Sequence, residues 1–532
     1  MATSLFCNSM IYSNGRFLHG AFTVEDGRFS NVFDEPFPDV SDAVTSYDMK
    51  QMFVLPGFND SHMHLLNYGH SMQGVLLAEH TDSLSRMLEH IREHLKDHPV
   101  RDNQWLLGRG WNQDYFTDTD RMPDRHDLDS ISVEIPIMIT RTCGHCAVLN
   151  SKALSLCNIT NGTLSPEGGE IEKKDGEPTG RLFENAITMA TDSIPSPDIN
   201  DLKEMLETAS RACNAYGITS VQSDDLLTFT DVDPFVVIEA IKELISEDRL
   251  SVRINEQCNF PGLKELEDFV DKDGFEIRFG DMYKSGPLKL LGDGSLGSRT
   301  AKLSVCYNGT DETGMLIYTD EELRDMICLA ASKGVGSVVH AIGDGCLDQV
   351  LEAFEYANSM YTGKRRNAIV HCQLSRADQL QRIADLGIDV LAQSIFLDYD
   401  NHIIYRLVPK ELADTSYNWK TLMDKGVHVS NGSDCPVELP DVLKGMQCAV
   451  TRTSMDGTGP YLLDQAFTVK EAIESFTTES AYASGEEDIK GQIKEGMLAD
   501  FTVLESDPFG TDPYSISKIK VRETWLGGKR VF

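Results

Sequence analysis

The sequence predicts an α/β protein whose main body is a closed parallel (β/α)8 barrel of the TIM type. Three observations support this fold class. Short apolar strands alternate with amphipathic helices along most of the chain. Eight such strands can be drawn, which is the number that closes a parallel barrel. Polar residues mark the ends of these strands, where barrel enzymes carry their chemistry.

The predicted barrel strands follow one another in a regular order. They are MFVLPGFND (52–60), GITSVQSDD (217–225), LSVRINEQ (250–257), PLKLLGDG (287–294), GSVVHAIGD (336–344), AIVHCQLS (368–375), DVLAQSIF (389–396) and HVSNGSD (428–434). About 150 residues separate the first strand from the second, far more than an ordinary connection between a strand and a helix needs. We therefore expect an inserted subdomain over about residues 70–200. The segments SLFCNSMIYS and GAFTVEDGRFSNVF predict further short strands before the barrel.

The composition limits the classes of function. The 532 residues include 48 basic and 84 acidic side chains, a net charge of -36, which repels phosphate backbones and anionic lipid surfaces. Nucleic acid and membranes are therefore not expected as partners. The N-terminal residues lack the pattern of a signal peptide, and no window approaches the roughly 18 apolar residues of a membrane helix. The 12 cysteines are scattered through apolar runs, which favours free thiols in a reducing, cytoplasmic environment.

The stretch RTCGHCAVLNSKAL contains Cys143 and Cys146 in the spacing of thiol–disulfide exchange enzymes. A redox centre of that type needs a preceding strand, a following helix and the rest of a thioredoxin-like unit. A strand is predicted before the pair, but only a short helix follows, and the remaining strands of such a unit are not found. The pattern therefore disfavours a redox centre.

The strand ends indicate a metal site. His62 and His64 are two residues apart, so in an extended segment both imidazoles point to one side. His340, His371 and Asp434 lie in or at the ends of later strands. One such residue alone is weak evidence, but their recurrence around one predicted barrel favours metal ligation.

Lys289 lies inside the fourth strand, where a cationic amine is costly to bury. Carboxylation of its amine removes this cost, because the resulting carbamate can bridge two metal ions. Lys289 is therefore a sixth candidate ligand.

At these residues the sequence resembles the amidohydrolase superfamily, specifically its YtcJ-like (amidohydrolase family 3) branch, which includes N-substituted formamide deformylases. The matching pieces cover nearly the whole chain: LPGFNDSHMH, GRGWNQ, GHCAVLNSKAL, LGDGSLGSRTA, HAIGD, SNGSDCPV, FTVKEAIESFTTESAYASG and GQIKEGMLADFTVLESDP. The resemblance implies a small β-sandwich domain built from residues 1–55 and 490–532, around a barrel over residues 56–489. In the GHCAVLNSKAL piece the family pattern makes the histidine the meaningful residue and the flanking thiols incidental.

The resemblance also implies two divalent metal ions, usually zinc, and a role for each ligand. His62 and His64 would hold the more buried ion with Asp434, while His340 and His371 would hold the second. Lys289 would bridge the two as an N6-carboxylated lysine. Asp434 would take a proton from the attacking water and pass it to the departing nitrogen. Relatives are often dimers, so a homodimer is a further expectation.

The expected substrate contacts are Trp111, Asp114, His145, Arg299 and Gln393. Alternatives stay open for two of them: Trp111 also suits a subdomain core, and Arg299 also suits a pairing with a carboxylate such as Asp293. At the seventh strand AQSIF replaces the Gln-Pro of many relatives, which leaves the local backbone shape around Gln393 open. Cys435, next to Asp434, is either a bystander or a source of oxidation sensitivity.

Three further histidines have a spacing that is typical of metal ligands on a helix. His90, His94 and His98 are spaced at four residues in SRMLEHIREHLKDHP, so a helix would align them. Their neighbours are mostly charged, which favours a solvated helix face over a second metal site.

Three functions compete. The leading one is a metal-dependent hydrolase of a carbon–nitrogen bond in a small amide or formamide. The second is a deaminase of the same superfamily with one metal ion, but no glutamate follows His340 in HAIGDG as such a site usually requires. The third is a barrel that binds without catalysis, and the presence of all six candidate ligands argues against it. Metal analysis separates the three, with about two ions, about one ion and few ions expected respectively.

Overall fold

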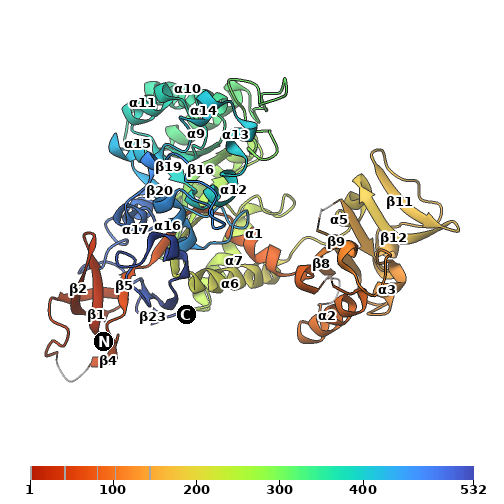
Figure 1. Ribbon diagram of the computed structural model, residues 1–532, viewed down its shortest axis with the longest axis horizontal. Coiled ribbons are helices and arrows are strands. Elements are labelled where there is room, and N and C mark those ends of the chain that lie inside the picture. The colour runs from red at the N-terminus through yellow and green to blue at the C-terminus, as the bar shows by residue number, and fades with distance from the viewer. Residues whose placement is uncertain (1–2, 41–43, 81, 102–103, 143–144) are drawn as a thin grey trace. The chain divides into compact units, whose positions relative to one another are not determined.

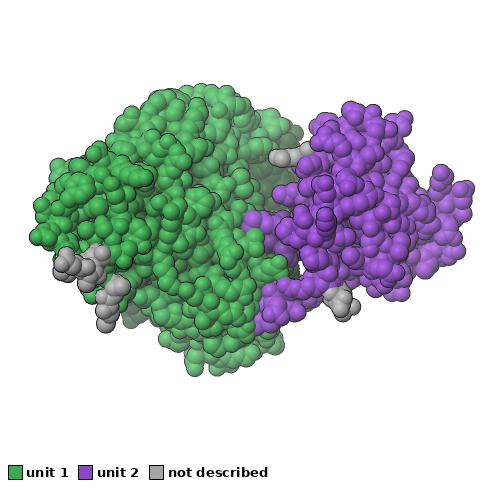
Figure 2. Space-filling view, turned by 90° about the horizontal axis from the view of Figure 1, so that it is seen from below, with its two compact units in different colours: residues 1–68, 202–532 green, residues 69–201 purple. Residues whose placement is uncertain are grey.

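The computed structural model describes residues 3–40, 44–80, 82–101, 104–142 and 145–532. The chain divides into two compact units (Figure 2). The larger unit comprises residues 1–68 and 202–532, and the smaller comprises residues 69–201.

The larger unit contains a nearly closed barrel of parallel strands surrounded by helices (Figure 1). The strands, in chain order, are β6 (Phe58–Met63), β13 (Ile218–Ser223), β14 (Arg253–Asn259), β16 (Tyr283–Leu291), β17 (Ser337–Ala341), β18 (Ala368–His371), β19 (Asp389–Ala392) and β20 (Val429–Asn431). Each strand pairs in parallel with the next. After β20 the Asp434 N–H donates to the His62 carbonyl oxygen at 2.8 Å, so the last strand meets the first. The predicted eight-stranded α/β barrel is confirmed.

The observed strands differ in extent from the predicted segments, and two of these segments also differ in structure. The segment 52–60 divides at Gly57 into β5 (Phe53–Pro56), which joins a separate sheet, and β6 of the barrel. A Cβ atom at Gly57 would lie only 2.1 Å from the Thr219 hydroxyl oxygen, so this crossing requires glycine. The segment 389–396 ends as a strand at Ala392, and residues 394–396 form a 3₁₀ turn.

Helices connect the strands of the larger unit, and several of them begin at side-chain caps. Thr319 with Glu322 and Thr468 with Glu471 form capping boxes, in which each side chain accepts the other residue's backbone N–H. No helix among the described residues combines the length and apolar character that a bilayer crossing needs. The helices are α1 (Leu65–Met72, which continues into the smaller unit), α6 (Ile199–Ala215, which begins in it), α7 (Pro234–Ser246), α8 (Leu263–Val270), α9 (Asp320–Ser332), α10 (Asp344–Met360), α11 (Ala377–Leu386), α12 (Leu397–Asp400), α13 (Ile404–Leu407), α14 (Lys410–Ala413), α15 (Trp419–Asp424), α16 (Val442–Thr451), α17 (Val469–Ser475) and α18 (Thr478–Ala483).

Both chain ends contribute to one mixed sheet in the larger unit. Its strands are β1 (Thr3–Ser13), β2 (Arg16–Glu25), β3 (Arg28–Phe33), β4 (Val44–Asp48), β5, β21 (Phe501–Leu504), β22 (Val521–Leu526) and β23 (Lys529–Arg530). Phe6, Phe22, Phe501 and Trp525 stack in its core. Since these strands form one sheet, the division into a β-sandwich with the predicted boundaries stays a prediction.

A buried ion pair ties this sheet to the barrel. The Arg253 guanidinium on β14 donates to both carboxylate oxygens of Asp500, at 2.6 and 2.9 Å. Both residues are less than a tenth exposed, so the two charges depend on each other for solvation.

The smaller unit has its own sheet and its own apolar core. Its strand order is β11 (Gly169–Lys174), β12 (Glu177–Glu184), β10 (Cys146–Leu149), β9 (Ile137–Arg141), β8 (Leu106–Trp111) and β7 (Val75–Leu76). Its helices are α2 (Leu84–Asp97), α3 (Arg125–Asp129), α4 (Ser151–Leu156) and α5 (Thr188–Thr191). One hydrophobic cluster lies around Trp111 and Ile139, and another lies around Leu149 and Leu182.

Candidate metal centre

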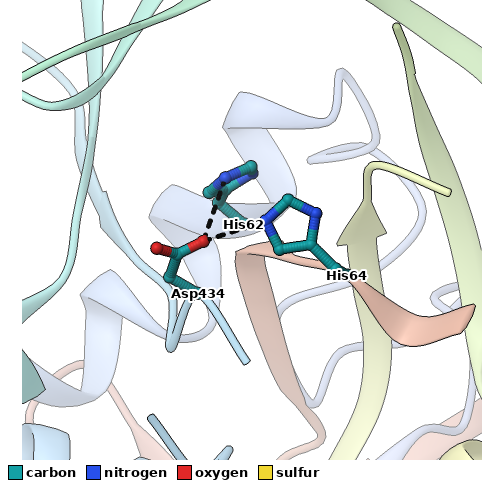
Figure 3. Close-up of side chains that lie close together, drawn as sticks. All are labelled: His62, His64 and Asp434. Carbon is teal, nitrogen blue, oxygen red and sulfur yellow. Dashed lines mark hydrogen bonds and ion pairs between the residues drawn. The ribbon is translucent and has the colours of Figure 1, made fainter. Parts of the chain in front are cut away.

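Three potential metal ligands meet where the first and last barrel strands join. His62 lies on β6 and His64 follows that strand, while Asp434 lies in the segment after β20. Asp434 Oδ1 lies 3.1 Å from His64 Nε2 and 3.4 Å from His62 Nε2 (Figure 3). The ligand atoms of all three residues lie within 4.8 Å of one another. Two imidazoles and a carboxylate are a donor set that suits zinc, so the site fits one divalent ion.

Hydrogen bonds orient both imidazoles of this cluster. Gln257 Nε2 donates to the Ser61 carbonyl oxygen at 3.0 Å, which leaves Gln257 Oε1 to accept from His62 Nδ1 at 2.7 Å. His64 Nδ1 lies 3.2 Å from the Asp224 carbonyl oxygen, which can only accept. In both residues Nδ1 therefore carries a hydrogen, and Nε2 is the atom offered to a metal ion.

Burial and charge tune the three groups differently. Burial, aided by the nearby Lys289, holds the pKa of His62 well below its ordinary value. Burial acts in the same direction on His64, but the Asp434 carboxylate outweighs it and raises the pKa of His64 to about 9. Burial disfavours the charged form of Asp434 too, yet the hydrogen bond from His64 and the charges of the histidines lower the pKa of that carboxyl. Without metal, Asp434 is therefore an anion paired with a protonated His64, beside a neutral His62, and a metal ion would take the place of the proton on His64 Nε2.

A second pair of histidines lies beside this cluster. His340 Nε2 lies 3.1 Å from the Gly294 carbonyl oxygen and 3.3 Å from Asp293 Oδ1, so this nitrogen carries the hydrogen. His340 Nδ1 then faces His371 Nε2 at 3.0 Å. The His371 ring lies 6.0 Å from the His62 ring, between centroids. Two imidazole nitrogens at this distance need a proton or a cation between them, so the pair also suits a metal ion.

Lys289 lies on β16 and is 1% exposed. Its Nζ atom donates to Asp224 Oδ2 at 3.2 Å. The buried ion pair satisfies the amine without any modification, so carboxylation of Lys289 stays a prediction. Asp224 is placed to contact both Lys289 and, through its backbone, His64.

The two predicted substrate contacts in the larger unit differ in burial. Gln393 is fully buried after β19, and neither its amide nitrogen nor its amide oxygen has a hydrogen-bond partner among the described residues. Arg299 is half-buried in the loop after β16, with a left-handed φ of 59°. Among the described residues no ion pair joins Arg299 to Asp293, because Asp293 accepts backbone N–H groups from Lys302, Ile342 and Gly343. Their contact with substrate stays a prediction.

The other three predicted substrate contacts lie in the smaller unit. Trp111 is fully buried in the core of that unit and donates to the Ile139 carbonyl oxygen, which favours the core interpretation. Asp114 is exposed and pairs with Arg141 at 3.0 Å. His145 is exposed, and its Nδ1 lies 2.8 Å from Glu184 Oε2. Substrate roles for Asp114 and His145 stay predictions.

The cysteines around these sites give no support to redox chemistry. Cys146 is buried on β10, and Cys143 lies outside the described residues. Cys435 is fully buried, and burial raises the pKa of its thiol well above the ordinary value. A thiol held in the protonated form is a poor nucleophile.

The histidines of α2 do not form a preorganised metal site. His80 stacks on His90, and His94 lies against His98. Among the described residues, the group of three or more ligands close enough for one ion is His62, His64 and Asp434.

Four residues that support the candidate ligands are missing from the predicted site: Asp60, Asp224, Gln257 and Asp293. Each lies in or beside a predicted barrel strand, so its position near the site was available from the pattern. The hydrogen-bond partner of each residue could not be predicted from the pattern, because Gln257 and His62 are 195 residues apart and Asp60 and Ser433 are 373 apart.

The chain is similar to known proteins over most of its length. A sequence model for the amidohydrolase family matches residues 46–532. The putative amidohydrolase YtcJ of Bacillus subtilis (strain 168) is 33% identical over 483 residues, which cover 90% of this chain and 89% of that protein. The N-substituted formamide deformylase of Arthrobacter pascens is 26% identical over 494 residues, 90% of this chain and 88% of that enzyme. A crystal structure of an uncharacterized metal-dependent hydrolase from Pyrococcus horikoshii OT3 aligns with a TM-score of 0.77 at 26% identity, covering 96% of this chain and 99% of that one.

Proposed function

The chain belongs to the amidohydrolase family, and on that premise we propose that it hydrolyses a carbon–nitrogen bond of a small amide or N-substituted formamide with bound divalent metal. The observation that carries this proposal is the cluster of His62, His64 and Asp434, whose ligand atoms lie within 4.8 Å of one another. The similarity to a formamide deformylase supports the choice of substrate class.

His62, His64 and Asp434 would hold one ion, and His340 with His371 would hold a second. The donor set of imidazoles and a carboxylate favours zinc. When bound, such ions lower the pKa of a water molecule and polarise the carbonyl group of an amide. Gln257 and Asp224 keep His62 and His64 in the orientation that ligation requires, because each accepts the hydrogen on Nδ1.

Asp434 would move the proton. Its Oδ1 is engaged by His62 and His64, so the carboxylate is held in one place at the barrel end. It would accept a proton from the attacking water and deliver it to the nitrogen of the departing amine.

Lys289 would bridge the two ions as a carbamate. The neutral amine attacks carbon dioxide, a nitrogen–carbon bond forms, and the amine loses a proton to solvent. This step requires Lys289 to leave its ion pair with Asp224. Lys289→Ala should lose most activity and regain part of it with added short carboxylic acids. A free amine pointing away from both ions in a metal-loaded crystal would contradict the bridge.

A one-metal deaminase is the second candidate, since among the described residues a cluster of three ligands forms around one ion position, whereas His340 and His371 offer two ligands. The acid that follows His340 does not replace the missing glutamate. Asp344, the first acid after His340, is fully buried and already accepts from Arg376 and Ser304.

The test is metal analysis of the purified protein, followed by assays on a panel of N-alkyl formamides and simple carboxamides. We expect about two zinc ions per chain and release of an amine together with formate or another acid. His371→Ala should lose one ion and most activity, while the matched control His90→Ala on α2 should keep both. Ammonia release with one ion would favour the deaminase, and a metal-free, inactive protein would indicate a binding barrel.

A further inference from the structure

Asp60 connects the first barrel strand to the segment that follows the last one. It lies on β6, is fully buried, and its Oδ1 accepts the backbone N–H of His62 at 3.2 Å and that of Ser433 at 3.0 Å. Its Oδ2 accepts the Ser433 hydroxyl at 2.6 Å. The Asp60 carboxylate therefore accepts hydrogen bonds both from β6 and from the segment after β20, where the first and last strands of the barrel meet.

The two segments approach each other more closely than side chains would allow. A Cβ atom at Gly432 would lie 2.6 Å from Asp60 Oδ1 and 2.6 Å from the His62 nitrogen. Beyond Gly432, the Asp434 N–H donates to the His62 carbonyl oxygen, and the His64 N–H donates to the Cys435 carbonyl oxygen, both at 2.8 Å. Asp434 and Cys435 are thus hydrogen-bonded through their backbones to the segment that carries both histidines.

The segment holds Asp434 in an uncommon conformation. Its φ of 57° lies in the left-handed region, which a residue with a side chain adopts at a cost unless its surroundings hold it there. In this conformation the carboxylate reaches 3.1 Å from His64 Nε2. The contacts of Asp60 with Ser433 lie one residue before Asp434 and support that conformation.

We propose that Asp60 is a positioning residue that locks the segment 432–435 onto β6 and so sets the distance from Asp434 to His62 and His64. The inference rests on the proposed function in that these three residues hold a metal ion. Asp60 itself touches neither substrate nor ion. It acts through the backbone of Ser433 and His62.

The test compares Asp60→Asn with Asp500→Asn. Asparagine keeps the shape of Asp60 and one oxygen that can accept the backbone N–H groups, but the amide nitrogen in place of Oδ2 cannot accept from the Ser433 hydroxyl. Asp500 is a matched control, because it is another buried carboxylate that accepts several donors, here from Arg253 and Gly527, without contact to the candidate ligands. Zinc affinity is measured by competition with a chelator, geometry by the visible spectrum of the cobalt-substituted protein, and stability by thermal unfolding without metal.

We expect Asp60→Asn to weaken zinc binding about 10- to 100-fold, as for other residues that orient metal ligands, and to change the cobalt spectrum. Asp500→Asn should lower the unfolding temperature and leave zinc affinity and the cobalt spectrum unchanged. Equal zinc affinity in Asp60→Asn and parent, or equal losses in both variants, would overturn the inference.

Ser433 provides a second route if Asp60→Asn does not fold. Ser433→Ala removes only the hydroxyl donor and should weaken zinc binding by a smaller factor, about 3- to 10-fold. Ser433→Thr restores the hydroxyl and should recover the affinity. Unchanged affinity in Ser433→Ala would count against the inference. A parent protein that binds no zinc would refute the proposed function as well, whereas a zinc-binding parent with no amide hydrolysis leaves the positioning role in place.

Discussion

Replacing Gln257 with leucine should weaken zinc binding by one to two orders of magnitude while leaving the fold intact. Gln257 is fully buried and makes two hydrogen bonds, accepting from His62 Nδ1 at 2.7 Å and donating to the Ser61 carbonyl oxygen at 3.0 Å. Leucine has a similar volume and makes neither bond. The His62 Nδ1 hydrogen is then buried without an acceptor, which costs about 1–3 kcal/mol.

The imidazole can avoid this cost by moving its hydrogen to Nε2. That nitrogen lies 3.4 Å from Asp434 Oδ1, which would accept it. The lone pair that a metal ion needs is then lost, so much of the penalty appears in metal affinity. A loss of about 1.4–2.8 kcal/mol in binding free energy corresponds to a dissociation constant for zinc that is about 10- to 100-fold larger.

Competition with a fluorescent chelator measures this loss, with urea denaturation of the metal-free protein measured in parallel. Gln222→Leu is the matched control, because Gln222 is also buried, lies on the adjacent strand β13 and donates to the Ser480 carbonyl oxygen without accepting from a histidine. It should lower stability without changing zinc affinity. A Gln257→Leu protein that binds zinc within twofold of the parent would refute the argument that Gln257 selects the ligating nitrogen.

Four further outcomes are expected. Asp434→Asn should keep at least one metal ion by elemental analysis and lower the catalytic rate by about two to four orders of magnitude; a near-parental rate would make Asp434 a structural ligand only. Arg253→Leu should lower the free energy of unfolding by about 3–5 kcal/mol in urea, because it leaves the buried Asp500 unpaired; a change below about 1 kcal/mol would contradict this. Burial raises the pKa of Asp389 to about 7, so the folded protein holds a proton that the unfolded chain releases, and stability falls as pH rises from about 4 to 7. Asp389→Asn should remove the contribution of Asp389 to that slope, at most about 1.4 kcal/mol per pH unit in urea titrations at several pH values, while Asp60 and Asp400, whose pKa values burial also raises, keep theirs; an unchanged slope would be evidence against it. Finally, replacing Cys143 and Cys146 with serine should leave turnover unchanged in reducing and mildly oxidising buffers, whereas a large loss would restore the redox interpretation.

The local sequence pattern was sufficient to predict the barrel. The strands from β16 to β19 contain short apolar runs between amphipathic helices, a pattern that parallel strands covered on both faces produce, while β13 and β14 carry more polar residues. The sequence pattern was less reliable where one apolar segment contributes to two different sheets. The segment 52–60 reads as one strand, but its two halves belong to different sheets, because the backbone crosses Thr219 at Gly57.

The ligand types were also readable from the chain. The spacing of His62 and His64 places both on one side of a strand end, and Asp434 ends the last predicted strand. The structure brings these three together as expected. Predicted contacts with substrate are different, because a residue such as Trp111 has the same sequence signature in a pocket and in an apolar core.

Residue types and their periodicity along the chain therefore determine the eight strands, their order and the histidines and carboxylate at their ends, since side-chain direction alternates in a strand whatever lies around it. Contacts between residues far apart in the chain decide the rest. They determine which imidazole nitrogen can bind a metal ion, which carboxylate joins the first barrel strand to the segment after the last one, and whether Lys289 has a counter-ion. Gln257 reaches His62 across 195 residues, and Asp224 reaches Lys289 across 65. A hydrogen bond depends on distances of a few tenths of an ångström, and those distances exist only after the barrel has closed.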